Sequence, residues 1–429
     1  MNQMLAAAPL VEGRDHFLRC ADEIGRRLCR DALRHGDNIN WLRTEPEQRE
    51  NLPQLLVRPV GADLYQGTAG IMLFLALLHQ RTGDRLVART LDQALAAATK
   101  SAGTGAGGFY TGDAGIGALF ISLGLLQGRE GLVEMGLARL GQAVRLHKPA
   151  ALDLLGGAAG LIPLLLTLAR HHDRPDFQDH ALTLGATLLA AGQSGPDGLC
   201  WPSGTEGPAP SGFAHGGAGM VPALASLHLA SGETHWAEAL TEVLRYQRAQ
   251  FNGPMGNWPD YRDAAGTPSP QPSFGASWCH GAAGIGRSRL WLLAAGAQDP
   301  VLGEELEAAL RVVAMAISQP AASAPADFSY CHGLAGMADL LLDAGLWLGR
   351  PELTALAAAA GYRGIERHAV PRIPWPCGLH GVGELPGLMT GLAGIGHFYL
   401  RLHDPLTTGS LLLPDPYLGT RNNTSGMKS

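Results

Sequence analysis

Apolar segments of two kinds alternate along the chain of 429 residues. In the first kind nearly every position is apolar, as in "IMLFLALL" (71–78), "IGALFISLGLL" (116–126) and "MVPALASLHLA" (220–230). A helix of this composition has no polar face to turn toward water, so it is expected to be covered on all sides. These segments predict helices buried inside the molecule.

Amphipathic segments lie between the apolar ones. In "DFQDHALTLGATLLAAG" (176–192), Phe177, Ala181, Leu184 and Leu188 are spaced by four, three and four residues. This spacing puts the apolar side chains on one face of a helix. A similar pattern occurs in "HWAEALTEVL", and strand-like alternation is scarce throughout. The second kind of segment therefore predicts helices with one apolar face.

A short motif, G-x-A-G, leads into each of the fully apolar segments. Glycine is abundant (58 of 429 residues) and alanine is also common, so roughly one copy of the motif is expected by chance. Seven copies occur at intervals of 45 to 65 residues, which indicates an internal repeat. Glycine at both positions removes the side chains that would keep neighbouring helix starts apart. The motifs begin at Gly67, Gly112, Gly157, Gly216, Gly281, Gly333 and Gly391.

Seven buried helices that alternate with one-faced helices can build an open solenoid or a closed ring. Solenoid repeats usually keep a fixed length so that neighbours stack in register, whereas the repeats here vary in length. The pattern favours an all-α fold, an α/α toroid of seven inner and seven outer helices, in one domain over residues 15–405. The Pro/Gly-rich stretches 194–211 and 252–277 are expected to be loops, and residues 406–429 a partly mobile C-terminal tail.

The charge of the chain gives no sign of a polyanionic partner. The net charge is −6, 16% of the residues are charged and no Lys/Arg run occurs, so neither nucleic acid nor an anionic membrane surface is expected. The longest apolar runs are shorter than the roughly 18 residues that a transmembrane segment needs. Residues 1–17 have no basic residue ahead of their apolar patch and make a poor secretory signal. A cytoplasmic protein is expected.

The repeat singles out two of the six cysteines. In a ring, equivalent positions of all repeats point to the same region, so unusual residues at one repeat offset indicate chemistry. Cys279 and Cys331 stand two residues before the first glycine of repeats 5 and 6, and His280 and His332 follow them directly. Thiolate and imidazole are the preferred ligands of zinc, and a catalytic zinc has three protein ligands and one open position. The two cysteines and one of the two histidines can form such a site.

The remaining cysteines are interpreted as structural. Cys20, Cys29 and Cys200 stand outside the repeat offset, and an isolated cysteine is usually a small buried apolar residue. Cys377, in "PWPCGLHG", lies near the mouth of the expected ring, where it could serve as a fourth, exchangeable thiolate. A buried structural residue is favoured there as well.

Two further polar residues are candidates for proton transfer. His215 occupies the offset of His280 one repeat earlier and has no cysteine before it, so its imidazole is free to move protons. Asp153 lies four residues before Gly157, on the approach to the same mouth, where a buried carboxylate would need a partner.

Together these motifs resemble the lanthionine synthetase C-like cyclases over nearly the whole chain. The resemblance is carried by "DLYQGTAGI", "LDLLGGAAG", "GFAHGGAGM", "NWPDYR", "SWCHGAAGIG", "SYCHGLAGM" and "PGLMTGLAGIG". The chain is most similar to the C-terminal cyclase half of class II lanthipeptide synthetases, in which "CHG" at both cysteine repeats is usual. The free-standing class I cyclases commonly have Tyr where this chain has His280, so the role of His280 stays open.

The resemblance implies an α/α toroid with one zinc ion, Zn2+, held by Cys279, Cys331 and His332. It also implies that His215 and Asp153 transfer protons during a Michael-type addition of a peptide cysteine thiol to dehydroalanine or dehydrobutyrine, which forms a (methyl)lanthionine ring. We expect zinc to activate the thiol and His215 to protonate the α-carbon. Asp153 would orient His215 or accept the thiol proton.

The class II likeness comes without a dehydratase half, and residues 1–16 look like a native start. If the chain is complete, its implied partners are a dehydrated precursor peptide and a separate dehydratase; otherwise it is an excised domain. Two other functions stay open: addition of a small thiol such as glutathione to dehydroamino acids, and a non-catalytic thiol- or peptide-binding scaffold. Protein prenyltransferases are also α/α toroids, but their Asp-Cys-His zinc set does not match the Cys-Cys-His set here.

Overall fold

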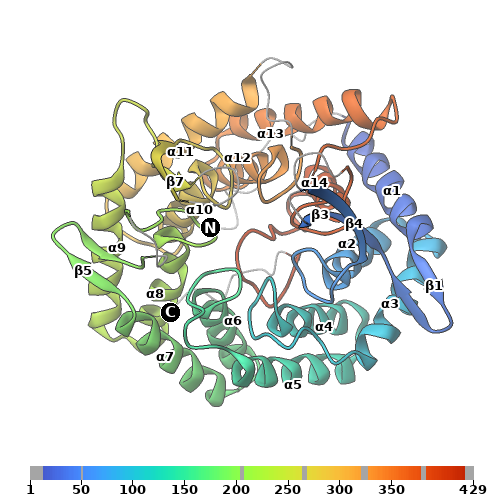
Figure 1. Cartoon of the computed structure of the whole chain (residues 1–429), viewed down its shortest axis with the longest axis horizontal. Coiled ribbons are helices and arrows are strands. Elements are labelled where there is room, and N and C mark those ends of the chain that lie inside the picture. Colours follow the sequence, from blue (N-terminus) through green and yellow to red (C-terminus); the bar gives the residue numbers. More distant parts are fainter. Residues whose placement is uncertain are drawn as a thin grey trace.

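Fourteen α-helices form a closed double ring in the computed structural model, which describes residues 13–49, 52–202, 207–262, 268–319, 327–377 and 383–420 (Figure 1). Each G-x-A-G motif begins a helix on the inside of the ring. These inner helices are buried along most of their length, as their composition predicted. They are α2 (Thr68–Thr82), α4 (Asp113–Gln127), α6 (Ala158–His171), α8 (Gly217–Ser231), α10 (Ala282–Ala294), α12 (Leu334–Leu348) and α14 (Leu392–His403).

The other seven helices form the outer layer. They are α1 (Arg14–Asp31), α3 (Arg85–Lys100), α5 (Glu130–Leu146), α7 (Pro175–Ala190), α9 (Thr234–Gln250), α11 (Val301–Ser318) and α13 (Pro351–Gly364), which continues into the π-helical turn η1 (Ile365–Ala369). Each packs against an inner helix; in α7 the buried face includes Phe177, Ala181, Leu184 and Leu188. The last helix, α14, packs against both α1 and α2, and this contact closes the ring. The predicted α/α toroid is therefore confirmed.

None of the described helices combines the length and the apolar character that crossing a membrane requires.

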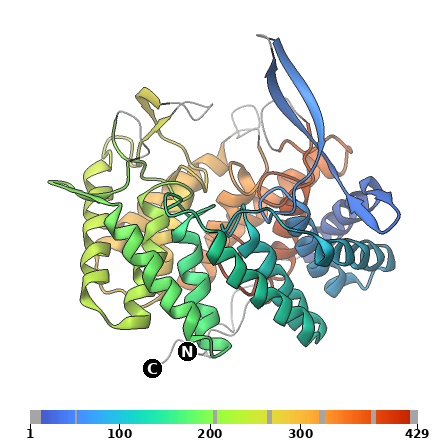
Figure 2. The ribbon, with the colours of Figure 1, turned by 60° about the horizontal axis from the view of Figure 1, so that its bottom comes forward.

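Four antiparallel hairpins were not predicted by the hydrophobic pattern. They are β1 (Leu33–His35) with β2 (Asn38–Asn40), β3 (Leu42–Arg49) with β4 (Leu52–Pro59), β5 (Gln193–Gly195) with β6 (Gly198–Cys200), and β7 (Asp260–Arg262) with β8 (Pro268–Ser273). The stretches 194–211 and 252–277 are thus not loops throughout. Strands of three residues are too short to show alternation. In the longest hairpin Leu55 and Val57 are exposed, and none of the hairpin side chains whose burial is described is buried. This hairpin and β7–β8 project from the same end of the ring (Figure 2).

A closed circle of backbone hydrogen bonds runs around the inside of the ring. It joins the loops to one another at the residue two positions before the first glycine of each motif, except that in repeat 3 Leu155 accepts one bond and the preceding residue, Leu154, donates the next. The N–H to O distances are 2.9 Å from Tyr65 to Tyr110, 2.9 Å from Tyr110 to Leu155, 3.2 Å from Leu154 to Ala214, 3.0 Å from Ala214 to Cys279, 3.3 Å from Cys279 to Cys331, 2.8 Å from Cys331 to Met389 and 2.8 Å from Met389 back to Tyr65. Each repeat is therefore joined to the next at the same position or, in repeat 3, one residue before it, and the seventh bond closes the circle.

The two glycines of each motif allow the loop to fold tightly onto the start of its own helix. A Cβ on Gly281 would lie 2.4 Å from the carbonyl oxygen of Gly275 in its own loop. A Cβ on Gly284 would lie 2.0 Å from the carbonyl oxygen of Trp278 and 2.5 Å from Cβ of Phe213 in the preceding repeat. The other six motifs show the same close contacts to loop backbone. The reason for the repeated glycines is therefore steric: the space that a side chain needs is occupied by backbone.

Part of the expected C-terminal tail is packed inside the ring. After α14 the segment Thr408–Thr420, here called the strap, crosses the middle of the ring (Figure 1). Leu411, Leu412 and Leu418 are each 1% exposed. Within the tail predicted over residues 406–429, the leucines of the strap therefore fill the ring interior. Residues 421–429 lie outside the described part of the chain.

Replacement of Gly284 by alanine is expected to lower the free energy of unfolding by about 1–3 kcal/mol, because the added Cβ overlaps backbone that cannot move without breaking the circle. Gly131, in α5, has open space around its would-be Cβ. Gly131→Ala is therefore the matched control and should leave stability unchanged or raise it by up to about 1 kcal/mol. Urea unfolding midpoints measure both effects. A Gly284→Ala protein as stable as the wild type would contradict the steric explanation.

Candidate metal centre

The loops that enter α8, α10 and α12 carry the candidate residues. All seven inner helices begin alike, because the residue after the first glycine donates its backbone N–H to the carbonyl seven residues earlier. In these three loops the distances are 2.9 Å from Gly217 to Pro210, 3.1 Å from Ala282 to Gly275 and 3.0 Å from Leu334 to Asp327. Because the loops share this conformation, the two residues before the glycine occupy equivalent places in each repeat. The cysteines and histidines of repeats 5 and 6 are thereby brought to the same end of the ring.

Cys279, Cys331 and His332 lie together as the sequence predicted. One ligand atom from each lies within 4.8 Å of the others, and Sγ of Cys331 is 3.7 Å from Nε2 of His332. Both thiols are buried, whereas the imidazole is exposed toward the mouth. Ligand atoms on a tetrahedral zinc are roughly 3.5–3.8 Å apart, given Zn–S and Zn–N bonds of about 2.3 and 2.0 Å. The two thiols and the imidazole therefore fit zinc in both chemical type and spacing.

The electrostatics of the cluster favour a bound cation. The pKa of the Cys279 thiol lies well below its ordinary range, because the hydrogen bond from Cys331 and those from the neighbouring imidazoles outweigh the effect of burial. Burial and the adjacent Cys279 sulfur raise the pKa of Cys331 well above its ordinary range. Desolvation alone would lower the pKa of His332, but the Cys279 thiolate raises it. The opposite shifts of the two cysteines follow from the closeness of their sulfur atoms, and the His332 imidazole lies near the sulfur whose pKa is lowered.

Tyr65 is a contact of the cluster that sequence reasoning missed. Its hydroxyl lies 2.8 Å from Sγ of Cys331 and donates a hydrogen bond to it. Burial raises the pKa of Tyr65 well above the ordinary value, so the hydroxyl keeps its proton. A signal was present in the sequence, because Tyr65 occupies in repeat 1 the offset that Cys279 and Cys331 occupy in repeats 5 and 6.

Asp153 and His215 form a hydrogen-bonded pair beside the cluster. Oδ2 of Asp153 is 2.6 Å from Nδ1 of His215, and its other oxygen, Oδ1, accepts the N–H of Gly156 at 2.9 Å. Burial would raise the pKa of the Asp153 carboxyl, but the hydrogen bond to His215 and those from the backbone lower it. The carboxylate is therefore ionised and holds one nitrogen of an imidazole that is 41% exposed. The other nitrogen, Nε2, can exchange protons with a bound molecule.

His280 connects this pair with the cluster. Its ring stacks on that of His215, with the centroids 5.6 Å apart and the planes 20° apart. The guanidinium of Arg262, in β7, donates a hydrogen bond to Nδ1 of His280 and forms two bonds with Asp260, of 2.9 and 3.2 Å. His280 is thus placed beside the cluster and lies outside its three-ligand group. Arg262 was not singled out, although it belongs to the quoted motif "NWPDYR".

Cys377 lies outside the group that can hold a metal among the described residues. Its sulfur accepts the backbone N–H of Leu385 at 3.4 Å, and burial raises the pKa of its thiol to about 12. Burial also raises the pKa values of Cys20, Cys29 and Cys200. These thiols are protonated at neutral pH, as expected of structural cysteines.

The chain matches a family model described as "Lanthionine synthetase C-like protein" over residues 58–413. Among solved structures it is similar to nisin cyclase, with a TM-score of 0.56 and 18% identity over 80% of this chain and 89% of that chain. It is also similar to the GH76A alpha-1,6-mannanase from Salegentibacter sp. HEL1_6, with a TM-score of 0.45 and 11% identity over 91% of this chain and 99% of that chain. No curated protein matches the chain in sequence.

Replacement of Cys279 or Cys331 by alanine is expected to release bound zinc, because each change removes one of three ligands from the cluster. Cys377→Ala is the matched control: it removes an equally buried thiol outside the cluster and should retain the metal. Metal content after dialysis, measured by atomic emission, tests this. A full equivalent of zinc in both Cys279→Ala and Cys331→Ala would show that the cluster is not the metal site.

Proposed function

Because the chain belongs to the lanthionine synthetase C-like family, we propose that it is a zinc-dependent peptide cyclase. The proposed reaction adds a cysteine thiol of a peptide to a dehydroalanine or dehydrobutyrine of the same peptide, and the product is a thioether ring. The observation that supports it most directly is the juxtaposition of two unlike sets of residues at one end of the ring. Cys279, Cys331 and His332 fit a metal, and Asp153 and His215 next to them fit proton transfer.

Cys279, Cys331 and His332 would hold the zinc. When bound, the zinc would supply a Lewis acid that lowers the pKa of a substrate thiol, so that the thiol loses its proton at neutral pH. Tyr65, by donating a hydrogen bond to Sγ of Cys331, draws charge from this ligand and keeps its sulfur in place.

The proton balance of the reaction defines the role of His215. The thiol loses its proton, sulfur bonds to the β-carbon of the dehydroamino acid, and the electrons of the double bond move toward the carbonyl oxygen as an enolate. The α-carbon then takes up one proton, so substrate and product have the same composition. In our proposal, Nε2 of His215 delivers that proton. Asp153 holds Nδ1 and so fixes the tautomer, and its negative charge stabilises the protonated ring.

The substrate implies a further activity, because dehydroamino acids arise from serine and threonine by loss of water. We propose that a dehydratase supplies the peptide and that this chain acts after it. The likeness to the cyclase half of class II synthetases, carried by "CHG" at both cysteine repeats, belongs to the same proposal.

A dehydrated peptide that contains cysteine tests the reaction. Incubation with the zinc-loaded protein is expected to remove the alkylatable thiol without changing the peptide mass, because cyclisation is an isomerisation. Mass spectrometry after thiol alkylation measures both quantities. Full alkylation of the peptide would contradict cyclase activity. A mass increase equal to an added small thiol, seen only when glutathione is supplied, would instead support addition of an external thiol.

His215→Asn and Asp153→Asn are expected to slow cyclisation while the zinc content stays at one equivalent. General acid catalysis typically contributes 10²–10⁴-fold, so a loss of roughly 10²-fold or more is expected for His215→Asn. Asp153→Asn keeps an oxygen for the N–H of Gly156 but loses the charge opposite His215. His228→Asn, in the last turn of α8, is the matched control and should have wild-type rates. Unchanged turnover in His215→Asn would exclude its role as the acid.

A further inference from the structure

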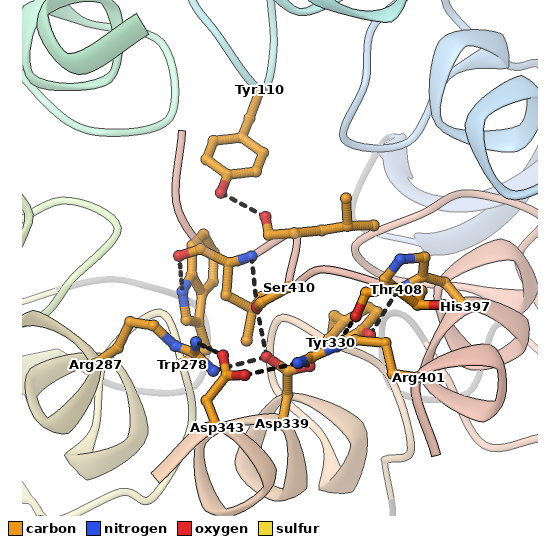
Figure 3. Close-up of polar contacts among 12 residues, drawn as sticks. Tyr110, Trp278, Arg287, Tyr330, Asp339, Asp343, His397, Arg401, Thr408 and Ser410 are labelled. Carbon is orange, nitrogen blue, oxygen red and sulfur yellow. Dashed lines mark hydrogen bonds and ion pairs between the residues drawn. The ribbon is translucent and has the colours of Figure 1, made fainter. Parts of the chain in front are cut away.

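We propose that the strap positions the metal centre from inside the ring, and that Trp278 is the positioning residue through which it acts. The inference rests on the metal centre proposed above. It concerns a segment that the mechanism does not use, and it begins from the contacts of the strap with the inner loops (Figure 3).

Two aromatic side chains from distant repeats hold successive carbonyls of the strap. The hydroxyl of Tyr110, in repeat 2, donates to the carbonyl oxygen of Leu411 at 2.8 Å. The indole N–H of Trp278, in repeat 5, donates to the carbonyl oxygen of Leu412 at 3.1 Å (Figure 3). All of these groups are buried, so each bond satisfies polar atoms that water cannot reach. The strap is therefore held in place by its backbone.

The strap is also anchored to a buried ion cluster, formed by Arg287 of α10, Asp339 and Asp343 of α12, and Arg401 of α14. Each arginine forms an ion pair with both aspartates. The distances are 2.6 Å from Arg287 to Asp339 and 2.7 Å from Arg401 to Asp343, and Arg287 also pairs with Asp343 and Arg401 with Asp339. Ser410 of the strap donates its hydroxyl to Oδ2 of Asp339 at 2.5 Å (Figure 3). With two positive and two negative charges, the cluster is balanced.

This cluster gives the strap a fixed place relative to three inner helices. The side chains of Arg401 and Asp339 are fully buried, and those of Arg287 and Asp343 are nearly so. Loss of one member of a buried ionic network leaves an uncompensated charge, so such networks resist rearrangement. Two of the three helices, α10 and α12, are those whose first turns follow the metal-binding cysteines.

Trp278 transmits the position of the strap to the ligands. Its ring lies edge-on to Tyr110 and Phe213, with centroids 5.6 and 5.7 Å away, and its indole N–H is bonded to the strap. The next residue is Cys279, whose N–H is bonded to the carbonyl of Cys331 at 3.3 Å. Rotation of the indole away from the strap would therefore turn the loop that carries one ligand and disturb its bond to the other.

Equivalent residues of the other repeats lack this link. The residues three positions before the first glycine are all large and buried. Among these described positions, Trp278 is the one whose side chain donates a hydrogen bond to the strap; Tyr330, the equivalent in repeat 6, contacts His397 instead. The seven residues are Leu64, Phe109, Leu154, Phe213, Trp278, Tyr330 and Leu388. The strap is thus bonded at the repeat that supplies the first cysteine ligand.

Trp278→Phe tests the proposal because it keeps an aromatic ring and removes the N–H. Zinc affinity, measured by competition with a chromophoric chelator, is expected to fall about tenfold or more, the usual range for loss of an outer contact of a metal site. Trp41→Phe is the matched control: Trp41 is 1% exposed and donates its indole N–H to the carbonyl of Leu28 at 2.7 Å, away from the cluster. It should cost similar stability but leave zinc affinity unchanged.

Ser410→Ala gives a second test that leaves the aromatic ring of Trp278 intact. It releases the strap from Asp339 and is expected to weaken zinc binding in the same direction. In both variants the cobalt-substituted protein should show shifted thiolate-to-metal and d–d bands, which a purely structural loss of stability would not shift.

Wild-type zinc affinity and cobalt spectra in both Trp278→Phe and Ser410→Ala would overturn the role of the strap and leave the metal centre standing. A wild-type protein that binds no zinc would overturn the metal centre and this inference together.

Discussion

The circle of seven backbone hydrogen bonds inside the ring is the constraint on which the rest of the structure depends. It joins the loop before every inner helix to its neighbour at one repeat position, with a shift of one residue for the donor in repeat 3, and the bond from Met389 to Tyr65 closes it. Each of these loops folds tightly onto the start of its own helix, and a Cβ on either glycine of the motif would overlap the loop backbone, which explains the two glycines of every motif. The circle also explains how repeats of unequal length form a regular ring: the joined positions are kept, and the extra residues lie in loops and hairpins.

The same circle creates the candidate site. Cys279 and Cys331 are members of it, and the N–H of one is bonded to the carbonyl of the other, so their side chains emerge side by side. His332 follows Cys331 and completes a ligand set, while His215 brings its bond with Asp153 to the same end of the ring. The candidate site therefore lies on loops, and these loops are held by a closed hydrogen-bond network and, at Trp278, by a bond to the strap.

The fold and the three-ligand cluster were predictable from the sequence because both are consequences of repetition. The seven motifs and the apolar segments behind them indicated the number of inner helices. Alignment of equivalent positions put Cys279 and Cys331 together with one of the two histidines, and the family resemblance pointed to His332. Contacts between dissimilar segments have no such signature. The bond from Arg262 to His280 joins a hairpin to a loop 18 residues further along. The strap, which is part of the tail predicted over residues 406–429, is held by contacts with segments that it does not resemble. Tyr65 was predictable only in part: the sequence shows that it occupies the repeat position of Cys279 and Cys331, but its hydrogen bond to Cys331 depends on closure of the ring.

The central claim is that equivalent positions of neighbouring repeats converge on a metal that receives a thiol. The most direct test is X-ray absorption at the zinc edge. Spectra are recorded on the zinc-loaded protein with and without a dehydrated peptide that contains cysteine. We expect two sulfur ligands, one imidazole nitrogen and one further light atom in the free protein, and three sulfurs once the peptide is added. A single sulfur in the free protein, or a coordination shell that the peptide leaves unchanged, would contradict this account.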